Sequence, residues 1–333
     1  MNIRDRRALV SEAENSLANA SYDPQKLILI HTGAVLVLSL LLSVVDYLLE
    51  HFIGSTGGLG GIGIRSILST AQSVLRILQA VALPFWQMGY VYLTMRLSRQ
   101  ESVTPSDLLH GFRNFRSVLR LELLRTFLYV GIIVLCSYIS SILFFLTPWA
   151  ASVSDAMLAL MENTSLLEDP AALQDALLPV MESAAVPMGI LFAIVALVLF
   201  LPVLYRYRMA SYALLDAPEK GALAALRSSR QMTRKNCIAL FRLDLHFWWF
   251  YLLEAAVTAL CYGDLILNWL GVPLPFDTTV AYFLFLVLSL GCQLGLYLWR
   301  KNLVSVSYAH AYHALNDARD LPVPNPEKQP WND

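Results

Sequence analysis

Residues 187–208 read PMGILFAIVALVLFLPVLYRYR, an apolar run that ends in two Tyr-Arg pairs. A basic amphipathic stretch follows at 218–235, and a second apolar run begins near residue 237. An α-helix rises 1.5 Å per residue, so a hydrocarbon core of roughly 30 Å needs about 20 apolar residues. This order predicts a membrane helix, a cytoplasmic elbow helix and a returning membrane helix.

Composition places the whole chain in the same class. Apolar residues make up 57% of the 333 residues and charged residues only 15%, whereas an ordinary soluble domain carries about 25% charged residues. The chain therefore has too few polar residues to cover a soluble surface. The four cysteines show no metal or redox spacing and are interpreted as buried apolar residues. No cleavable signal peptide is expected, because the first apolar run starts behind a polar leader.

Hydropathy divides the chain into three parts. Residues 1–26 are an amphipathic leader on the cytoplasmic membrane surface, 27–318 are a membrane domain, and 319–333 are a disordered cytoplasmic tail. We expect a Gly-rich link at 54–63, elbow helices at 108–119 and 218–235, two short surface helices broken at Pro170, a final amphipathic helix at 301–318, and spans at 27–49, 73–95, 121–149, 187–207, 237–262 and 278–299. The predicted fold is an all-α membrane protein of about six transmembrane helices with amphipathic cytoplasmic elbow helices.

The distribution of positive charge predicts the orientation. The leader, the link between spans 2 and 3, the link between spans 4 and 5, and the tail together carry 22 of the 24 Lys and Arg residues, counted with their flanks. The loops between spans 3 and 4 and between spans 5 and 6 carry none. Because cytoplasmic loops are enriched in Lys and Arg, both termini are expected in the cytoplasm.

A short internal similarity links the third and fifth spans. Arg120-Leu121-Glu122-Leu123 opens one and Arg242-Leu243-Asp244-Leu245 opens the other, each after a basic elbow. A parallel duplication and shared interface chemistry both explain this match. Each Arg can reach the headgroups, while each acid (Glu122 and Asp244) lies deeper and needs a partner, either that Arg or one on the neighbouring elbow.

Ionisable residues inside the spans are the first candidates for function, because charges are costly there. Asp46, Arg76 and Glu254 all fall toward the outer ends of their spans. They either form an ion path or polar-substrate contact, or a structural ion pair of Arg76 with Asp46 or Glu254. Asp244 and His246 lie near the inner end of the fifth span, but two residues apart on a helix they do not share a face.

Other polar residues have simpler readings. His310 and His313 could share a helix face, but no third ligand is near, so we expect solvated side chains and neither a metal site nor a cofactor. Basic elbow residues either only set the topology or bind anionic lipid headgroups or a membrane-protein partner, at about 1 kcal/mol per charge. These are Arg113, Arg116, Arg227, Arg230, Arg234 and Lys235. The expected environment is a lipid bilayer, with no nucleic-acid partner.

Four stretches carry a resemblance to a known family. They are LLHGFRNF at 108–115, MASYALLDAP at 209–218, GALAALRSSRQM at 221–232 and LFRLDLHFWW at 240–249. Together they resemble the bacterial integral-membrane family named domain of unknown function 975. The chain departs from that family at Arg234-Lys235-Asn236, where a Gly is usual, and in its long loop between spans 3 and 4. The resemblance implies a multi-pass fold in a bacterial cytoplasmic membrane and brings no known activity or catalytic residue.

Three functions stay open. A non-enzymatic accessory or scaffold protein in membrane or envelope physiology ranks first, because charges cluster at the interfaces and no nucleotide or catalytic motif is present. A small-solute or ion transporter or permease is the alternative, based on Asp46, Arg76, Glu254 and the internal similarity. A lipid-handling membrane enzyme ranks last, because the sequence lacks HExxH and GxSxG motifs.

Overall fold

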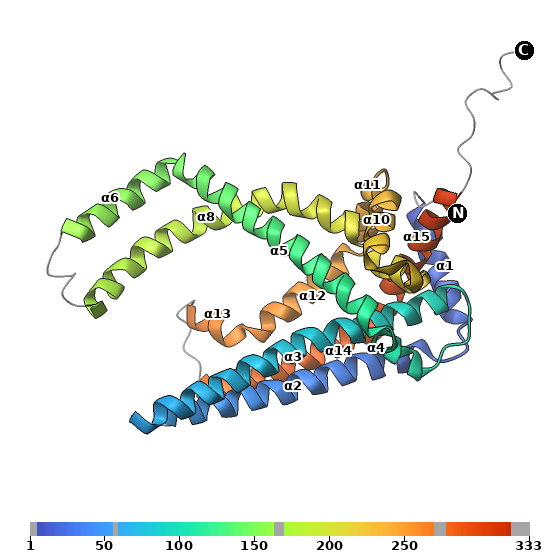
Figure 1. Cartoon of the computed structure of the whole chain (residues 1–333), viewed down its shortest axis with the longest axis horizontal. Coiled ribbons are helices and arrows are strands. Elements are labelled where there is room, and N and C mark those ends of the chain that lie inside the picture. The colour runs from blue at the N-terminus through green and yellow to red at the C-terminus, as the bar shows by residue number, and fades with distance from the viewer. Residues whose placement is uncertain (1–4, 56–58, 163–169, 270–277, 321–333) are drawn as a thin grey trace, which may run out of the picture. The chain divides into compact units, whose positions relative to one another are not determined.

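The computed structural model describes residues 5–55, 59–162, 170–269 and 278–320 (Figure 1). Within these ranges every regular element is a helix. The chain divides into two compact units, one of residues 1–121 with 209–333 and the other of residues 122–208.

Among the described residues, five helices are long and apolar enough to cross a membrane, which indicates a membrane protein. The helices that form them are α2 (Pro24–Ser55), α3 (Leu59–Ser98), α5 (Phe115–Phe145), α8 (Pro170–Tyr207), and α14 (Thr278–Leu296) with its continuation. Their apolar parts are Pro24–Leu49, Ser66–Ser98, Phe115–Phe145, Ala172–Asp216 and Val280–Ala318. Because α2 continues to Ser55 and α3 begins at Leu59, little of the expected Gly-rich link remains.

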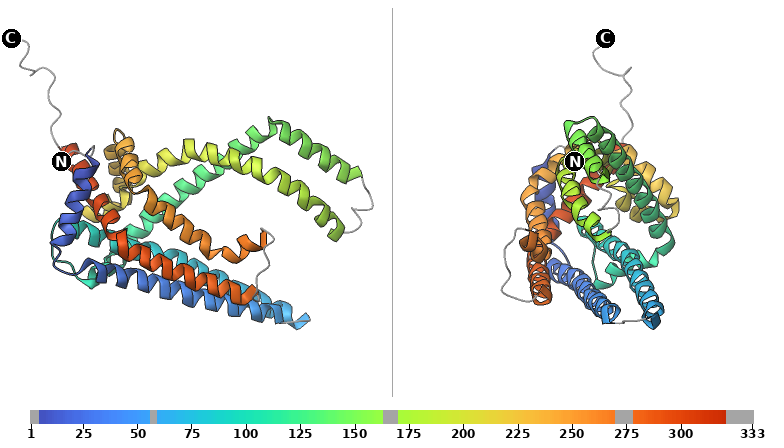
Figure 2. Two further views of the ribbon diagram at one scale, coloured as in Figure 1. Left: turned by 180° about the vertical axis from the view of Figure 1, so that it is seen from behind. Right: turned by 90° about the vertical axis from the view of Figure 1, so that its left-hand side faces the viewer.

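In the first unit, α2, α3 and α14 run side by side, and α12 (Trp248–Cys261) packs on α14 (Figures 1 and 2). After α14 the chain makes a π-helical turn, η3 (Tyr297–Lys301), and continues as α15 (Asn302–Asp320). The amphipathic helix predicted for 301–318 is thus present. The leader helix α1 (Arg6–Ala18) packs along α15, burying Leu9 and Ala13, so the two ends of the described chain meet.

The first elbow begins with a side-chain cap. The Thr104 backbone N–H donates to the Asp107 carboxylate (2.8 Å), which also accepts from Arg96 Nη1 (2.9 Å). The helical turn η1 (Pro105–Leu109) and the short helix α4 (His110–Arg113) follow. The single elbow helix predicted for 108–119 is therefore interrupted at Asn114, and its last residues belong to α5. The second elbow consists of α9 (Ala210–Asp216), η2 (Pro218–Lys220), α10 (Gly221–Thr233) and α11 (Cys237–His246).

Two glycines let the first elbow lie directly against α3. A Cβ atom at Gly89 would stand 1.7 Å from the Leu108 carbonyl oxygen, and one at Gly111 would stand 2.0 Å from the Phe85 carbonyl oxygen. These distances are far inside van der Waals contact. No larger residue fits at either position unless the two backbones separate, so the pair fixes how closely the elbow packs.

The expected fifth span, residues 237–262, is not one helix. It is broken at Phe247 into α11, which packs on α1, and α12, which packs on α14. At the break the Phe247 N–H donates to the Asp244 carbonyl (2.9 Å), and the Phe250 N–H donates to the Phe247 carbonyl (2.9 Å). Both phenylalanines are buried. Hydropathy alone does not reveal the break, because both sides of it are apolar. The short helix α13 (Gly263–Trp269) follows α12.

The second unit contains most of α5, then α6 (Pro148–Glu162) and α8. Of the two predicted surface helices, α6 is present, whereas the other is the beginning of α8, which starts at Pro170 and contains three further prolines. Residues 163–169 lie outside the described part. Tyr129 of α5 meets Phe200 of α8 edge to face, with ring centroids 5.5 Å apart.

Replacing Gly89 or Gly111 by Ala should destabilise the protein by about 1–3 kcal/mol or more, because overpacking forces the two backbones apart. The measurement is the apparent unfolding midpoint of purified protein in detergent. Gly291→Ala in α14 is the control, since nothing lies within 4 Å of its Cβ position. An unchanged midpoint in Gly89→Ala and Gly111→Ala would contradict this packing.

Candidate functional site

The last helix, α15, presents a row of polar side chains to the rest of the first unit: Asn302, Tyr308, Tyr312 and His313 (the α15 polar row). Tyr308 and Tyr312 are one helical turn apart and therefore share a face. The Tyr308 hydroxyl donates to Asp244 of α11, and the Tyr312 hydroxyl donates to Asp216 of α9 (3.0 Å). Both tyrosines are at most 5% exposed, and a buried hydroxyl needs an acceptor within the protein.

Each of the two aspartates also has a second partner. Asp244 accepts a hydrogen bond from the Tyr251 hydroxyl of α12 (2.9 Å). Asp216 forms an ion pair with Arg99, which follows the end of α3. Asp244 thus joins α11, α12 and α15, while Asp216 joins α9 and α15 to the end of α3.

The remaining members of the row contact α2 and α3. Asn302 accepts a hydrogen bond from the Tyr90 hydroxyl (2.9 Å) and donates to the Pro24 carbonyl (2.7 Å). His313 Nε2 lies 3.0 Å from the Ser98 hydroxyl. The row therefore ties the last helix to the first two long helices.

His310 and His313 are packed rather than solvated, which corrects the expectation. His310 Nε2 lies 3.0 Å from the Ser16 hydroxyl of α1, and its Nδ1 lies 3.6 Å from the Glu12 carboxylate. The two imidazoles thus face different helices, α1 and α3. Among the described residues, no group of three His, Cys, Asp or Glu side chains could hold a metal ion.

Glu254 belongs to a second polar cluster, at the π-helical turn. Its carboxylate accepts a hydrogen bond from the Tyr297 hydroxyl (2.6 Å) and lies 3.7 Å from Lys301 Nζ. The same ammonium is 4.5 Å from the centre of the Tyr297 ring, within the range of a cation–π contact. Gln293 donates to the Tyr297 hydroxyl (3.2 Å). A carboxylate, a phenol and an ammonium therefore meet among the apolar helices.

This arrangement places Glu254 differently from the sequence prediction. Counting from residue 237 put Glu254 deep in a continuous span, toward its outer end. The break at Phe247 leaves Glu254 only two turns into α12, beside the last residues of the α14–η3 segment. Its described ion-pair partner is Lys301, not the Arg76 that the sequence pattern proposed.

Three further residues were predicted to be intramembrane candidates: Asp46, Arg76 and His246. Asp46 belongs to α2, but its side chain lies outside the described part of the structure. Arg76 lies in α3 and His246 ends α11, and both side chains are exposed.

The two similar Arg-Leu-acid-Leu segments bury their first Leu alike: Leu121 and Leu243 are at most 1% exposed. Arg120 and Arg242 are exposed. The acids differ in their partners, since Glu122 pairs with Arg125 (2.5 Å) whereas Asp244 accepts from two tyrosines. Asp244 therefore has tyrosine donors from α12 and α15, whereas Glu122 pairs with an arginine of its own helix.

The predicted basic elbow residues all have exposed side chains: Arg113, Arg116, Arg227, Arg230, Arg234 and Lys235. Next to them His110 stacks on Tyr92, with ring centroids 3.6 Å apart, and its Nε2 lies 3.0 Å from Asn114 Nδ2. Burial lowers the pKa of His110, and the positive charges of Arg113 and Arg96 lower it further against the opposing effect of Asp107.

Sequence reasoning missed Arg99, Tyr297, Lys301, Tyr308 and Tyr312. The spacing of Tyr308 and Tyr312 was a usable signal, because two buried phenols on one face of a helix need two acceptors. Nothing in the sequence indicated which acids would supply them.

Residues 24–290 match the family described as "Protein of unknown function (DUF975)". The chain belongs to this family. The matched range includes Asp216, Asp244 and Glu254 and ends before the α15 polar row. No curated protein and no solved structure matches the chain.

Glu254→Gln should destabilise the protein, because it removes the negative charge that lies 3.7 Å from the Lys301 ammonium. Both side chains are about 30% exposed, so we expect a coupling energy of only about 1 kcal/mol in a double-mutant cycle with Lys301→Met. Apparent unfolding in detergent measures it, and Glu219→Gln, an exposed carboxylate in η2, serves as the control. A coupling energy of zero would mean that the pair does not form.

His110 should make the protein less stable in mild acid. A histidine whose pKa is lowered by folding binds protons more readily when unfolded, so its contribution is complete above about pH 6.5 and is lost below it. His110→Phe keeps a stacking ring and removes the titration. Its unfolding midpoint should fall less than that of the wild type between pH 7 and pH 5. Equal falls would contradict this assignment.

Proposed function

We propose that this protein is a non-enzymatic accessory or scaffold protein of a bacterial cytoplasmic membrane, which binds anionic lipid or a membrane-protein partner through its basic elbows. One observation supports the proposal: acidic side chains form bonds between helices, whereas basic side chains of the elbows are exposed. The acids Asp216, Asp244 and Glu254 hold helices together, whereas the elbow cations are exposed. Interhelical bonds engage the acids, and exposed cations are available for contacts.

The proposed topology has six crossings and cytoplasmic termini. Five crossings would leave the two termini on opposite sides of the membrane. A sixth crossing is therefore needed for both termini to lie in the cytoplasm. The apolar helix α12 has 14 residues, about 21 Å at 1.5 Å per residue, and the separate helix α13 follows it. Because α11 belongs to the second elbow and not to the span, Arg242 joins the cations of that elbow. The positive-inside rule then places both elbows in the cytoplasm.

The test is gentle purification from native membranes, followed by mass spectrometry of the bound proteins and lipids. The triple variant Arg227→Gln, Arg230→Gln, Arg234→Gln should lose the associated partner or anionic lipid by about a hundredfold in affinity, at about 1 kcal/mol per charge. Asp155→Asn with Glu162→Gln removes exposed charges from α6 instead and should change nothing.

If neither a stoichiometric partner nor enriched anionic lipid accompanies the wild type, the accessory proposal is wrong. Equal recovery of that partner or lipid with the triple variant would also count against it, because the elbows would then not be the contact surface.

Transport of a small solute or ion is the second candidate, and the Glu254 cluster favours it. Charged residues in membrane helices often mark ion or substrate paths, and π-helical turns occur frequently at functional sites. Flux into proteoliposomes decides between the two roles. A transport site predicts that Glu254→Gln keeps its protein level and loses flux, whereas a structural pair predicts lowered stability without a flux to lose.

A further inference from the structure

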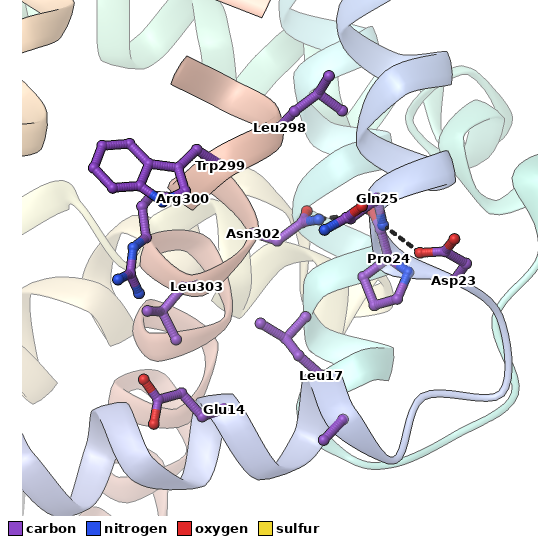
Figure 3. Close-up of a pocket in the computed structure, with 11 residues that line it drawn as sticks. Glu14, Leu17, Asp23, Pro24, Gln25, Leu298, Trp299, Arg300, Asn302 and Leu303 are labelled. Atoms are coloured by element: carbon purple, nitrogen blue, oxygen red, sulfur yellow. Dashed lines mark hydrogen bonds between the residues drawn. The ribbon is translucent and has the colours of Figure 1, made fainter. Parts of the chain in front are cut away.

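The first unit contains a groove where its two ends meet. The end of α1, the beginning of α2, the turn η3 and the beginning of α15 line a space of about 370 Å³ (Figure 3). This volume is within the range of small-ligand sites. Its polar lining is Glu14, Asp23, Gln25, Arg300 and Asn302, and Leu17, Pro24, Leu298, Trp299 and Leu303 contribute much of its apolar lining.

Arg300 is the cation of this groove. Its Nε atom is buried and has no hydrogen-bond partner within the described part of the chain. A guanidinium has five N–H donors and no acceptor, so a buried N–H without an acceptor is costly. The guanidinium carbon lies 5.6 Å from the centre of the Trp299 ring. Arg300 is therefore held in place on an aromatic surface, with donor capacity left for a ligand.

Two carboxylates complete the charge pattern. Figure 3 shows Glu14 on the same side of the groove as Arg300, with Asp23 on the opposite side. Asp23 accepts the backbone N–H of Gln25 (2.9 Å) through one of its oxygens. Asn302 is already engaged with Tyr90 and Pro24. A ligand that fits this lining carries an anionic acceptor for Arg300 and a cationic N–H donor for the acids.

The position of the groove indicates that this ligand comes from the membrane. It lies at residue 24, where the apolar part of α2 begins and the polar leader ends. Trp299 is 61% exposed, and Leu29 and Ile30 of the next turn of α2 are exposed as well. Exposed Trp beside exposed aliphatic residues is typical of the membrane–water interface. The groove is thus at the depth of lipid headgroups.

We propose that this groove binds the phosphoethanolamine headgroup of a phospholipid. The phosphate accepts hydrogen bonds from Arg300, and the ammonium donates to Glu14 or Asp23. A headgroup with only negative charge would face two carboxylates, and a choline headgroup has no N–H to donate. This site is separate from the exposed elbow cations, and its lipid differs in charge from theirs.

The test uses the purified full-length protein in detergent and native mass spectrometry. The protein is titrated with phosphatidylethanolamine, phosphatidylcholine and phosphatidylglycerol of identical acyl chains, and with soluble glycerophosphoethanolamine. We expect Arg300→Gln to weaken phosphatidylethanolamine binding by at least about tenfold, as expected for a charge-assisted hydrogen bond, and to weaken phosphatidylglycerol and phosphatidylcholine binding less. Glu162→Gln, an exposed carboxylate of α6, is the control and should leave this binding unchanged.

A second variant keeps the proposal testable if Arg300→Gln does not fold. Glu14→Gln should weaken phosphatidylethanolamine and leave phosphatidylglycerol no weaker, because it removes a negative charge. Equal weakening of the three lipids by Arg300→Gln, or a larger loss for phosphatidylglycerol than for phosphatidylethanolamine, would overturn the proposal. Glycerophosphoethanolamine binding as tightly as the lipid would overturn the membrane source and identify a soluble ligand of the same chemistry.

Discussion

Two hydrogen bonds from α15 hold the first unit together: Tyr308 to Asp244 and Tyr312 to Asp216. A buried phenol without an acceptor is unfavourable, and a carboxylate among helices needs donors. Each of the two bonds gives the phenol an acceptor and the carboxylate a donor. Because the two aspartates come from different segments of the second elbow, α15 joins α9 and α11. The same helix covers α1, so the first and last described helices depend on this docking.

Backbone geometry supplies the complementary constraint on the first elbow. Gly89 and Gly111 allow α3 and the η1–α4 segment to touch through their main chains. Phe85 then stacks on Phe115, with ring centroids 4.7 Å apart. The first elbow is therefore held by close backbone packing together with the Arg96–Asp107 ion pair, whereas the second elbow is joined to α15 by hydrogen bonds. Both leave their arginines on the outside, which is what a binding surface on the elbows requires.

Local signals predicted much of this fold. Hydropathy indicated the long apolar helices, Thr104 to Asp107 indicated the start of the first elbow, and amphipathic spacing indicated α1 and α15. The break at Phe247 could not be predicted, because α11 and α12 are both apolar and differ only in the helices that they contact. The partner of Glu254 was not predicted for the same reason. In one unbroken helix from residue 237, Glu254 would lie near the outer end of the span, far from Lys301. Asp216 was noticed only within a family-like stretch, since its partners Arg99 and Tyr312 are distant in sequence.

The central claim is that polar residues of the last helix are structural and hold α15 in place. Hydrogen–deuterium exchange of the full-length protein tests it most directly. The account predicts that the amides of residues 302–315 exchange as slowly as those of α14, and that Tyr308→Phe with Tyr312→Phe accelerates exchange in α15, α9 and α11 together. Fast exchange in wild-type α15, or a double variant whose exchange equals that of the wild type, would contradict it.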